Sequence, residues 1–110
     1  MQIGRFREVD SGYAGRLQTL ALDVPLRLVS IQRDTANAPD WRVHFDDNGN
    51  EPEVGSGWTH QRDGGGSFIA LQLDCPTFAR PLRANLVPAR GELDVHVLLW
   101  SRPARSKRGE

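Results

Sequence analysis

Three histidines are the first residues to consider for chemistry, because imidazole binds metals and exchanges protons near neutral pH. His44, His60 and His96 fall in three separate segments that alternate between apolar and polar residues like β-strands. The alternation points His44 and His96 away from the core, whereas His60 shares the phase of Trp58. Because the three side chains do not converge and no carboxylate stands beside them at ligand spacing, we expect no metal site.

The single cysteine, Cys75, is the next candidate for chemistry. One cysteine excludes an internal disulfide and any Cys-x-x-Cys motif. Asp74 beside it disfavours the thiolate that a nucleophile needs, and no partner base is evident. The run Gly64-Gly65-Gly66 lacks the lysine and hydroxyl of a phosphate-binding loop, and the acidic stretch 46–53 lacks the final glutamate of a calcium loop. We therefore expect no catalytic residue, no cofactor and no enzyme activity.

Short β-strands are the elements predicted to position these residues. The 11 glycines and 7 prolines leave few windows for a helix of ordinary length. Between them, the alternation has the two-residue period of a half-buried strand. We predict strands near residues 2–9, 13–22, 24–32, 41–45, 54–61, 67–73, 82–88 and 93–101. These strands indicate an all-β, single-domain fold, either an antiparallel small barrel or a compact sandwich of about seven or eight strands.

One face of these strands is predicted to form the core. Its members are Leu26, Leu28, Trp41, Val43, Phe45, Ile69, Leu71, Leu73, Leu82, Ala84, Leu86, Val95, Val97 and Leu99. Leu98 and Trp100 point opposite to Leu99 in this scheme, and we assign Trp100 to the core as a plug at one end. Ile31 breaks phase with Leu28, which implies a bulge or a strand buried on both faces.

The overall charge is balanced, with 14 basic and 14 acidic side chains. This balance argues against strong, non-specific binding to a polyanion. Thirteen of the 14 bases are arginine, which suits planar recognition of phosphate or carboxylate and stacking on aromatic rings. A GC-rich gene would produce the same bias.

Charge is also separated by structural role. Most acids fall in predicted turns, whereas several arginines fall in mid-strand, on the faces opposite the core. The residues predicted to share this outer face are Arg16, Arg27, Arg42, His44, Arg83 and Asn85. Small β-barrels bind single-stranded nucleic acid on such a face, since arginine meets phosphates while aromatic rings stack on bases. The alternative is that these arginines are ordinary solvated side chains that discourage edge pairing.

The two ends of the chain complete the domain plan. We expect one β domain over residues 1–102 and a disordered basic tail over 103–110, where Arg105, Lys107 and Arg108 could add electrostatic contacts. No run reaches the 18 or more apolar residues that a membrane helix requires, and the first residues do not read as a signal peptide. These features predict a soluble, cytoplasmic protein without a membrane partner.

Several phrases of the sequence together resemble a bacterial family of small proteins, domain of unknown function family 736. They are Ile3-Gly4-Arg5-Phe6, Gly12-Tyr13-Ala14-Gly15 leading to Leu20, Ala38-Pro39-Asp40-Trp41-Arg42-Val43, Gly55-Ser56-Gly57-Trp58, Leu71-Gln72-Leu73-Asp74 with Pro76-Thr77-Phe78, Ala84-Asn85-Leu86 and Leu99-Trp100-Ser101-Arg102. The resemblance spans residues 2 to 102. It implies a compact β-rich protein often encoded among plasmid, conjugation or integrative-element genes, and it carries over no catalytic residue.

Together these observations predict a non-enzymatic binding module that holds single-stranded nucleic acid weakly through its strand-borne arginines. The alternative is a protein–protein adaptor or a homodimer. That alternative would use an edge strand or an exposed apolar patch around Phe68 and Trp100.

Overall fold

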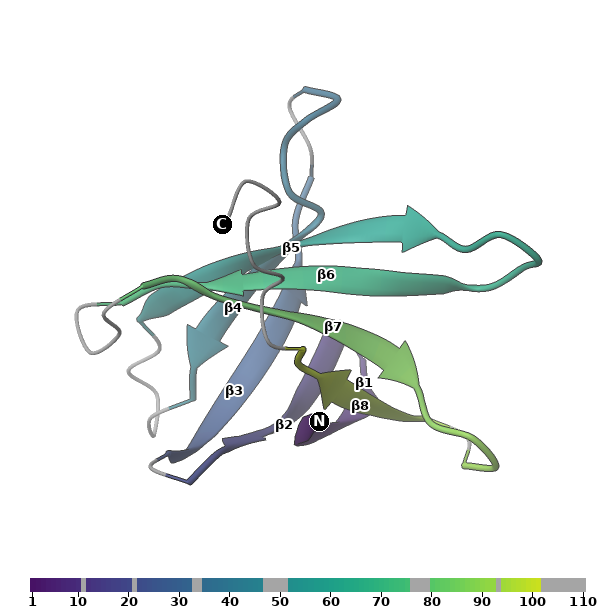
Figure 1. Ribbon diagram of the computed structural model, residues 1–110. Helices are drawn as coiled ribbons and strands as arrows, with labels where there is room; N and C mark the ends of the chain where they lie inside the picture. Colours follow the sequence, from purple (N-terminus) through teal and green to yellow (C-terminus); the bar gives the residue numbers. More distant parts are fainter. Residues whose placement is uncertain are drawn as a thin grey trace, which may run out of the picture.

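The computed structural model describes residues 1–10, 12–20, 22–32, 35–46, 52–75, 80–92 and 94–101. These residues form eight β-strands and no helix (Figure 1). The strands are β1 (Gln2–Val9), β2 (Gly12–Gln18), β3 (Asp23–Ser30), β4 (Trp41–Phe45), β5 (Glu53–Gln61), β6 (Ser67–Leu73), β7 (Leu82–Pro88) and β8 (Val95–Leu99). The predicted all-β, single-domain fold is confirmed. Among the described residues, no helix is long and apolar enough to span a membrane.

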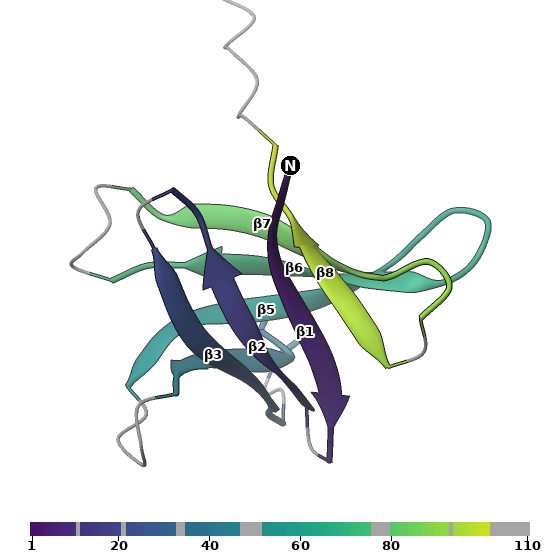
Figure 2. The same cartoon turned by 90° about the horizontal axis from the view of Figure 1, so that it is seen from below.

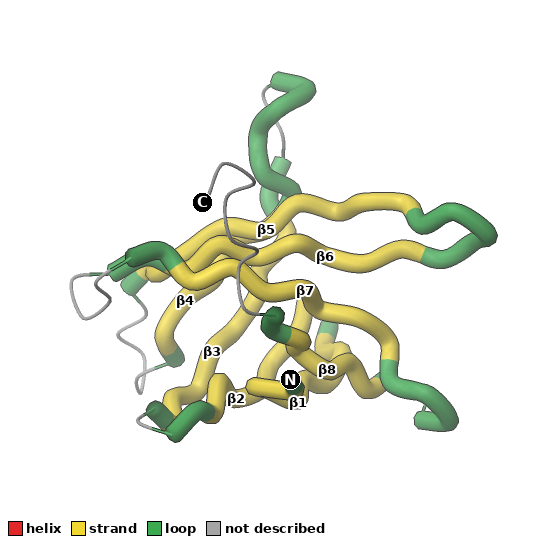
Figure 3. The backbone as a smooth tube through the Cα atoms, viewed as in Figure 1, coloured by secondary structure: helices red, strands yellow, loops and turns green. Residues whose placement is uncertain are grey.

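The strands follow one another around a closed barrel, each antiparallel to the next, and β8 returns to pair with β1. Figure 2 shows β1 and β8 side by side, and Figure 3 shows the connecting loops at the strand ends. The N-terminal amine donates a hydrogen bond to the Trp100 carbonyl oxygen at 3.0 Å, and the Trp100 amide donates one to the Met1 carbonyl at 2.8 Å. Of the two predicted architectures, the chain therefore adopts the barrel.

Because apolar and polar residues alternate along the strands, apolar side chains fill the barrel interior. Phe6, Val43, Leu86 and Leu98 are fully buried, and the described residues include no buried polar or charged residue. The predicted core members on β3, β6 and β7 are confirmed, with Leu26, Leu28, Ile69, Leu71, Leu73, Ala84 and Leu86 buried and Leu82 packed against them. Phe6, which was not among the predicted core residues, is fully buried in this cluster.

The predicted core face of β8 is confirmed for Val95, which is buried, but it is wrong for Val97 and Leu99. Leu98 is fully buried opposite Gly4 of β1 and Leu86 of β7, whereas Leu99 is 39% exposed. Val97 shares the outer phase of Leu99, and His96 pairs with Phe6 on the inner phase. Five of the six residues from 95 to 100 are apolar, so polarity alone could not distinguish the two faces. Trp100 is half-buried and packs against the core.

The prediction for Ile31 and the predicted end of the second strand also differ from the structure. β3 ends at Ser30, so Ile31 lies beyond the strand and creates neither a bulge nor a strand buried on both faces. The register shifts occur instead in β1 between Gln2 and Gly4 and at β4 between Val43 and His44. β2 likewise ends earlier than predicted, at Gln18.

The hairpin of β5 and β6 extends past the rest of the barrel as an arm, defined here as residues 60–68 (Figure 1). The pairing of β6 with β7 stops at Ile69, whereas the pairing of β5 with β6 continues to Gln61 and Ser67. A glycine-rich turn closes the arm, and Gly64, Gly65 and Gly66 have φ values of 85°, 108° and 81°. These positive φ values favour glycine because a Cβ atom would clash with the backbone.

Candidate functional site

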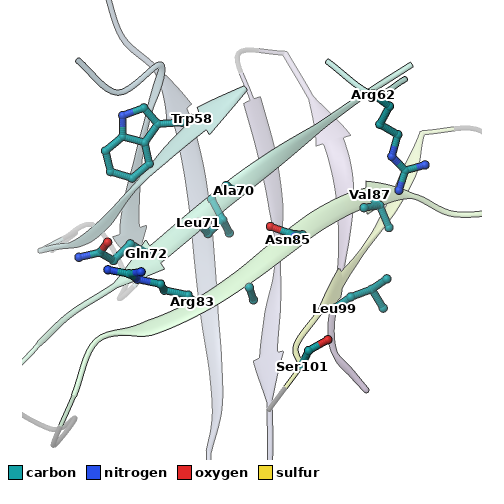
Figure 4. A pocket seen from close by; sticks show the side chains of 11 residues that line it. Trp58, Arg62, Ala70, Leu71, Gln72, Arg83, Asn85, Val87, Leu99 and Ser101 are labelled. Atoms are coloured by element: carbon teal, nitrogen blue, oxygen red, sulfur yellow. The ribbon is translucent and has the colours of Figure 1, made fainter. Parts of the chain in front are cut away.

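A groove of about 610 Å³ lies on the outer face of β5, β6, β7 and β8 (Figure 4). Its floor is a row of residues in direct register across the four strands. Trp58 pairs with Ala70, Ala70 with Asn85, and Asn85 with Leu99. Since neighbouring strands lie about 4.8 Å apart, the row spans about 14 Å. This length accommodates a short segment of an extended polymer.

The polar groups of this groove are cationic or neutral. Gln72 pairs with Arg83 one row from the floor, and Arg62 reaches over from the arm toward Val87 (Figure 4). Among the described residues that line the groove there are two arginines and no carboxylate. No described carboxylate forms an ion pair with Arg83. The groove therefore has a local positive potential in a chain of zero net charge.

The indole of Trp58 is half-buried at one side of the groove. Its Nε1 atom donates a hydrogen bond to the Asn37 carbonyl oxygen at 3.1 Å. This bond to the loop before β4 fixes the orientation of the ring, so its stacking surface is held in place before a ligand arrives. Preorganisation of this kind reduces the entropic cost of binding.

A stack of three side chains stiffens the arm that carries Arg62. The His60 and Phe68 rings lie 5.4 Å apart between centroids with an interplanar angle of 28°. The Arg62 guanidinium carbon lies 6.0 Å from the Phe68 ring centroid. This cation–π geometry restricts Arg62 to the side of the arm that faces the groove.

The predicted arginine face is divided between two walls of the barrel. All six predicted residues lie on the outer surface. Arg27 pairs with His44, and Arg16 and Arg42 lie one diagonal step away, so these four gather on β2, β3 and β4. Arg83 and Asn85 lie on β7, beyond β5 and β6. The expectation of a single shared face is therefore wrong, because closure turns β7 to another side.

Carboxylates neutralise part of the β2–β4 wall. Arg16 Nε lies 2.7 Å from Asp23 Oδ1, and Arg42 Nη1 lies 2.6 Å from Glu53 Oε1. Asp23 and Glu53 are the first residues of β3 and β5, so acids predicted in turns lie beside arginines in the neighbouring strands. Of the predicted set, Arg83 and Asn85 are the two that the structure brings into the groove.

Sequence reasoning missed Trp58, Arg62 and Gln72. None of the three was among the residues predicted to bind a ligand. The alternation around Ile69 and Leu71 does place Gln72 outside, and Trp58 lies outside because it directly follows the inward-facing Gly57. The approach of Arg62 to β7 depends on the arm and has no sequence signal.

The histidines do not form a metal site among the described residues. His44 is on the outside of β4, as its phase predicted, and His60 is exposed on the arm, but the outward prediction for His96 is wrong. His96 lies inside the barrel end, 4.7 Å from the Tyr13 ring in an edge-on contact. Burial lowers the pKa of His96, and the nearby Glu8 carboxylate partly opposes this shift. Burial raises the pKa of Tyr13, and Glu8 raises it further.

The other residues considered as possible sites are scattered over the molecule or lie outside the residues that the structure describes. Cys75 is half-buried at the opposite barrel end, and the tail residues Arg105, Lys107 and Arg108 lie outside the described residues, as do residues 47–51 of the acidic stretch. Trp100 lies near Leu82 at the start of β7, whereas Phe68 lies on the arm. These two side chains therefore do not form one apolar patch.

Comparison with known proteins identifies one family. A family model described as "Protein of unknown function (DUF736)" matches residues 2–103, nearly the whole chain, and confirms the resemblance seen in the sequence. No curated protein and no solved structure matches the chain.

Proposed function

Since this chain belongs to the DUF736 family, whose description assigns no activity, we propose a function from the site itself. The protein is a non-enzymatic module that binds a short segment of single-stranded nucleic acid in the groove over β5–β8. The observation that carries this proposal is a groove with an oriented indole, two arginines, two amides and no carboxylate among its described lining residues.

Each group in the groove has a role in this proposal. The Trp58 ring stacks on one base, because every base offers a π face and single strands leave it accessible. Arg62 and Arg83 contact phosphates from the two sides of the groove. The Gln72 and Asn85 amides both donate and accept hydrogen bonds, so they can pair with base edges. We place this activity in the bacterial cytoplasm and in the mobile-element setting that the resemblance implied.

Fluorescence anisotropy with a labelled single-stranded oligonucleotide, measured over a range of salt concentrations, tests the proposal. For single strands, log affinity falls against log salt with a slope of about 0.7 per phosphate contact. The Arg62→Ser/Arg83→Ser double variant is expected to lose about 1.4 of this slope, equivalent to two contacts. Trp58→Leu is expected to weaken binding by about 1–3 kcal/mol at every salt concentration and leave the slope unchanged.

The Arg16→Ser/Arg42→Ser double variant is the matched control. It removes the same charge from the β2–β4 wall, where both arginines already pair with carboxylates. It is expected to retain the wild-type slope. Equal losses in the two double variants would show diffuse electrostatic attraction and remove the groove from the proposal. No binding by the folded wild type at low salt would remove nucleic acid altogether.

The closed barrel also bears on the adaptor alternative. Each of the eight described strands pairs with two neighbours in the barrel wall, so the unpaired strand edges among the described residues lie in the arm, where β5 and β6 continue past β4 and β7. A protein partner would therefore extend the arm or dock on a surface such as the groove. Light scattering over a wide concentration range, run beside the anisotropy titration, tests self-association.

A further inference from the structure

A second concave site lies inside the barrel, at the end opposite Tyr13 and His96. Its volume is about 230 Å³. Leu17 and Leu26 form the floor and are 1% and 3% exposed, while the half-buried Val24, Phe45 and Val54 form the walls with Cys75. Beyond the floor, Phe6 and Leu28 fill the barrel centre. The described residues therefore form a cup whose floor lies toward the barrel centre and whose mouth lies toward the barrel end.

The chemistry of this end cup is almost entirely hydrocarbon. Apart from the Cys75 thiol, its described lining side chains carry no polar atom, and none of them is charged. A wholly polar ligand would lose its hydration there without gaining a hydrogen bond. An alkyl group gains from leaving water in proportion to the area it buries. A ligand that fits must therefore place an apolar part inside and keep any polar head at the mouth.

The volume limits how much of such a ligand can enter. An apolar protein cavity of about 150 Å³ accommodates benzene, with six carbon atoms. Scaled by volume, the end cup accommodates roughly nine carbon atoms. Eight-stranded barrels have an interior that side chains fill or that holds one small ligand, and here the centre is filled while one end is not.

We propose that the end cup binds the alkyl tail of a soluble amphiphile, about nine carbons long, with the polar head in water at the mouth. The cup lies inside the barrel between β2, β3, β4 and β5, whereas the groove lies outside on β5–β8. The two proposals rest on different residues, so either can fail without the other.

Titration of the full chain with 1-alkanols from 1-butanol to 1-decanol, followed by methyl NMR of leucine and valine, tests this proposal. Each added CH₂ is worth about 0.8 kcal/mol, which tightens binding about fourfold. We expect this gain to continue to about nine carbons and then stop, because further carbons remain in water. The saturable shifts should centre on the methyl groups of Leu17, Val24 and Leu26.

Variants on the inner and outer faces of β3 distinguish alkanol binding inside the cup from alkanol adsorption on the protein surface. Val24→Phe fills the cup and is expected to weaken 1-octanol binding by tenfold or more, as about two CH₂ groups are displaced. Val29→Phe adds the same bulk on the outer face, where Val29 pairs with Arg42, and is expected to bind like the wild type. Leu26→Ala enlarges the cup by about three carbons, so in this variant the affinity should still rise from nine carbons to 1-decanol, where the wild type has reached its plateau.

The alkanol titrations have results that support the end cup and results that overturn it. A plateau that shifts with Leu26→Ala supports the cup even where Val24→Phe fails to fold. The proposal is overturned by the absence of saturable binding, by affinity that rises through 1-decanol without a plateau, or by equal losses in Val24→Phe and Val29→Phe.

Discussion

His96 is a titratable side chain inside the barrel end, and its Nδ1 atom is buried without a hydrogen-bond partner among the described residues. Burial lowers the pKa of His96 below its ordinary value of 6.5, and the nearby carboxylates of Glu8 and Asp94 only partly oppose this shift. Tyr13, which contacts the ring, has a raised pKa and stays neutral throughout the range in which histidine titrates. The folded state therefore favours neutral His96.

The stability of the protein is expected to depend on pH through this residue. A group with a depressed folded pKa contributes stability that is fully present above the unfolded pKa and is lost as pH falls through the folded pKa. The free energy of unfolding should therefore decrease as the pH is lowered from 6.5. The slope is at most about 1.4 kcal/mol per pH unit, because one proton is bound. Urea unfolding from about pH 8 to about pH 5 measures it.

Two histidine variants isolate the contribution of His96. His96→Phe retains a ring against Tyr13 and is expected to flatten the pH dependence in this window. His60→Gln changes an exposed side chain on the arm and is expected to keep the wild-type profile. A His96→Phe protein whose profile equals that of the wild type would contradict the assignment.

Leu98 and Leu99 provide a second test at the residue scale, because they are adjacent and differ in face. Leu98→Ala leaves a cavity opposite Gly4 and Leu86 and is expected to cost about 2–5 kcal/mol of unfolding free energy. Leu99→Ala removes a side chain that is 39% exposed and is expected to cost less than about 1 kcal/mol. Denaturant unfolding of both variants measures the difference, and a reversed order would restore the face predicted from the sequence.

At the scale of elements, glycines set how closely β1 approaches β2 and how β5 accommodates its neighbours. A Cβ atom on Gly15 would lie 2.2 Å from the Arg5 carbonyl oxygen and 2.6 Å from Phe6 Cγ. A Cβ atom on Gly57 would instead meet side-chain methyl groups, Leu71 Cδ2 at 2.8 Å and Ile69 Cγ2 at 2.9 Å. Backbone cannot move aside without breaking the strand pairing, whereas the ends of side chains can rotate.

The two glycine positions should therefore differ in their tolerance of alanine. Gly15→Ala is expected to destabilise the protein by about 3 kcal/mol or more, and Gly57→Ala by about 1 kcal/mol, the two ends of the range for overpacking. Thermal and urea unfolding measure both. Equal costs would mean that β1 and β2 can separate locally, contrary to the tight register between them.

At the scale of the whole molecule, closure by β1 and β8 brings Met1 beside Trp100. Closure also explains why arginines that look equivalent along the sequence separate in space. A strand three places further round a barrel faces another direction, whereas in an open flat sheet it would share the same side. The groove and the β2–β4 wall are therefore separate surfaces.

Closure predicts that the chain can be circularly permuted. With a flexible linker joining the two ends, new termini at the exposed turn between Gly64 and Gly65 are expected to leave the fold intact. New termini between Leu71 and Gln72 would interrupt a strand that is paired on both sides and should abolish folding. Circular dichroism and thermal unfolding of the two permutants distinguish these outcomes. Failure of the first would mean that the ends must remain separate.

The sequence by itself determined the eight strands, their antiparallel order and most of the core, since the two-residue alternation around Leu26, Leu71 and Leu86 is local and each turn is marked by its own residues. The polarity pattern gave the wrong face for Val97, Leu99 and His96 of β8, because nearly every residue there is apolar and because a histidine can lie inside the sheltered barrel end. The tertiary structure alone decided the sites. The groove needs Trp58, Arg62 and Arg83 from two strands and the arm, and the direction in which each strand faces follows from closure, which is a property of all eight strands together.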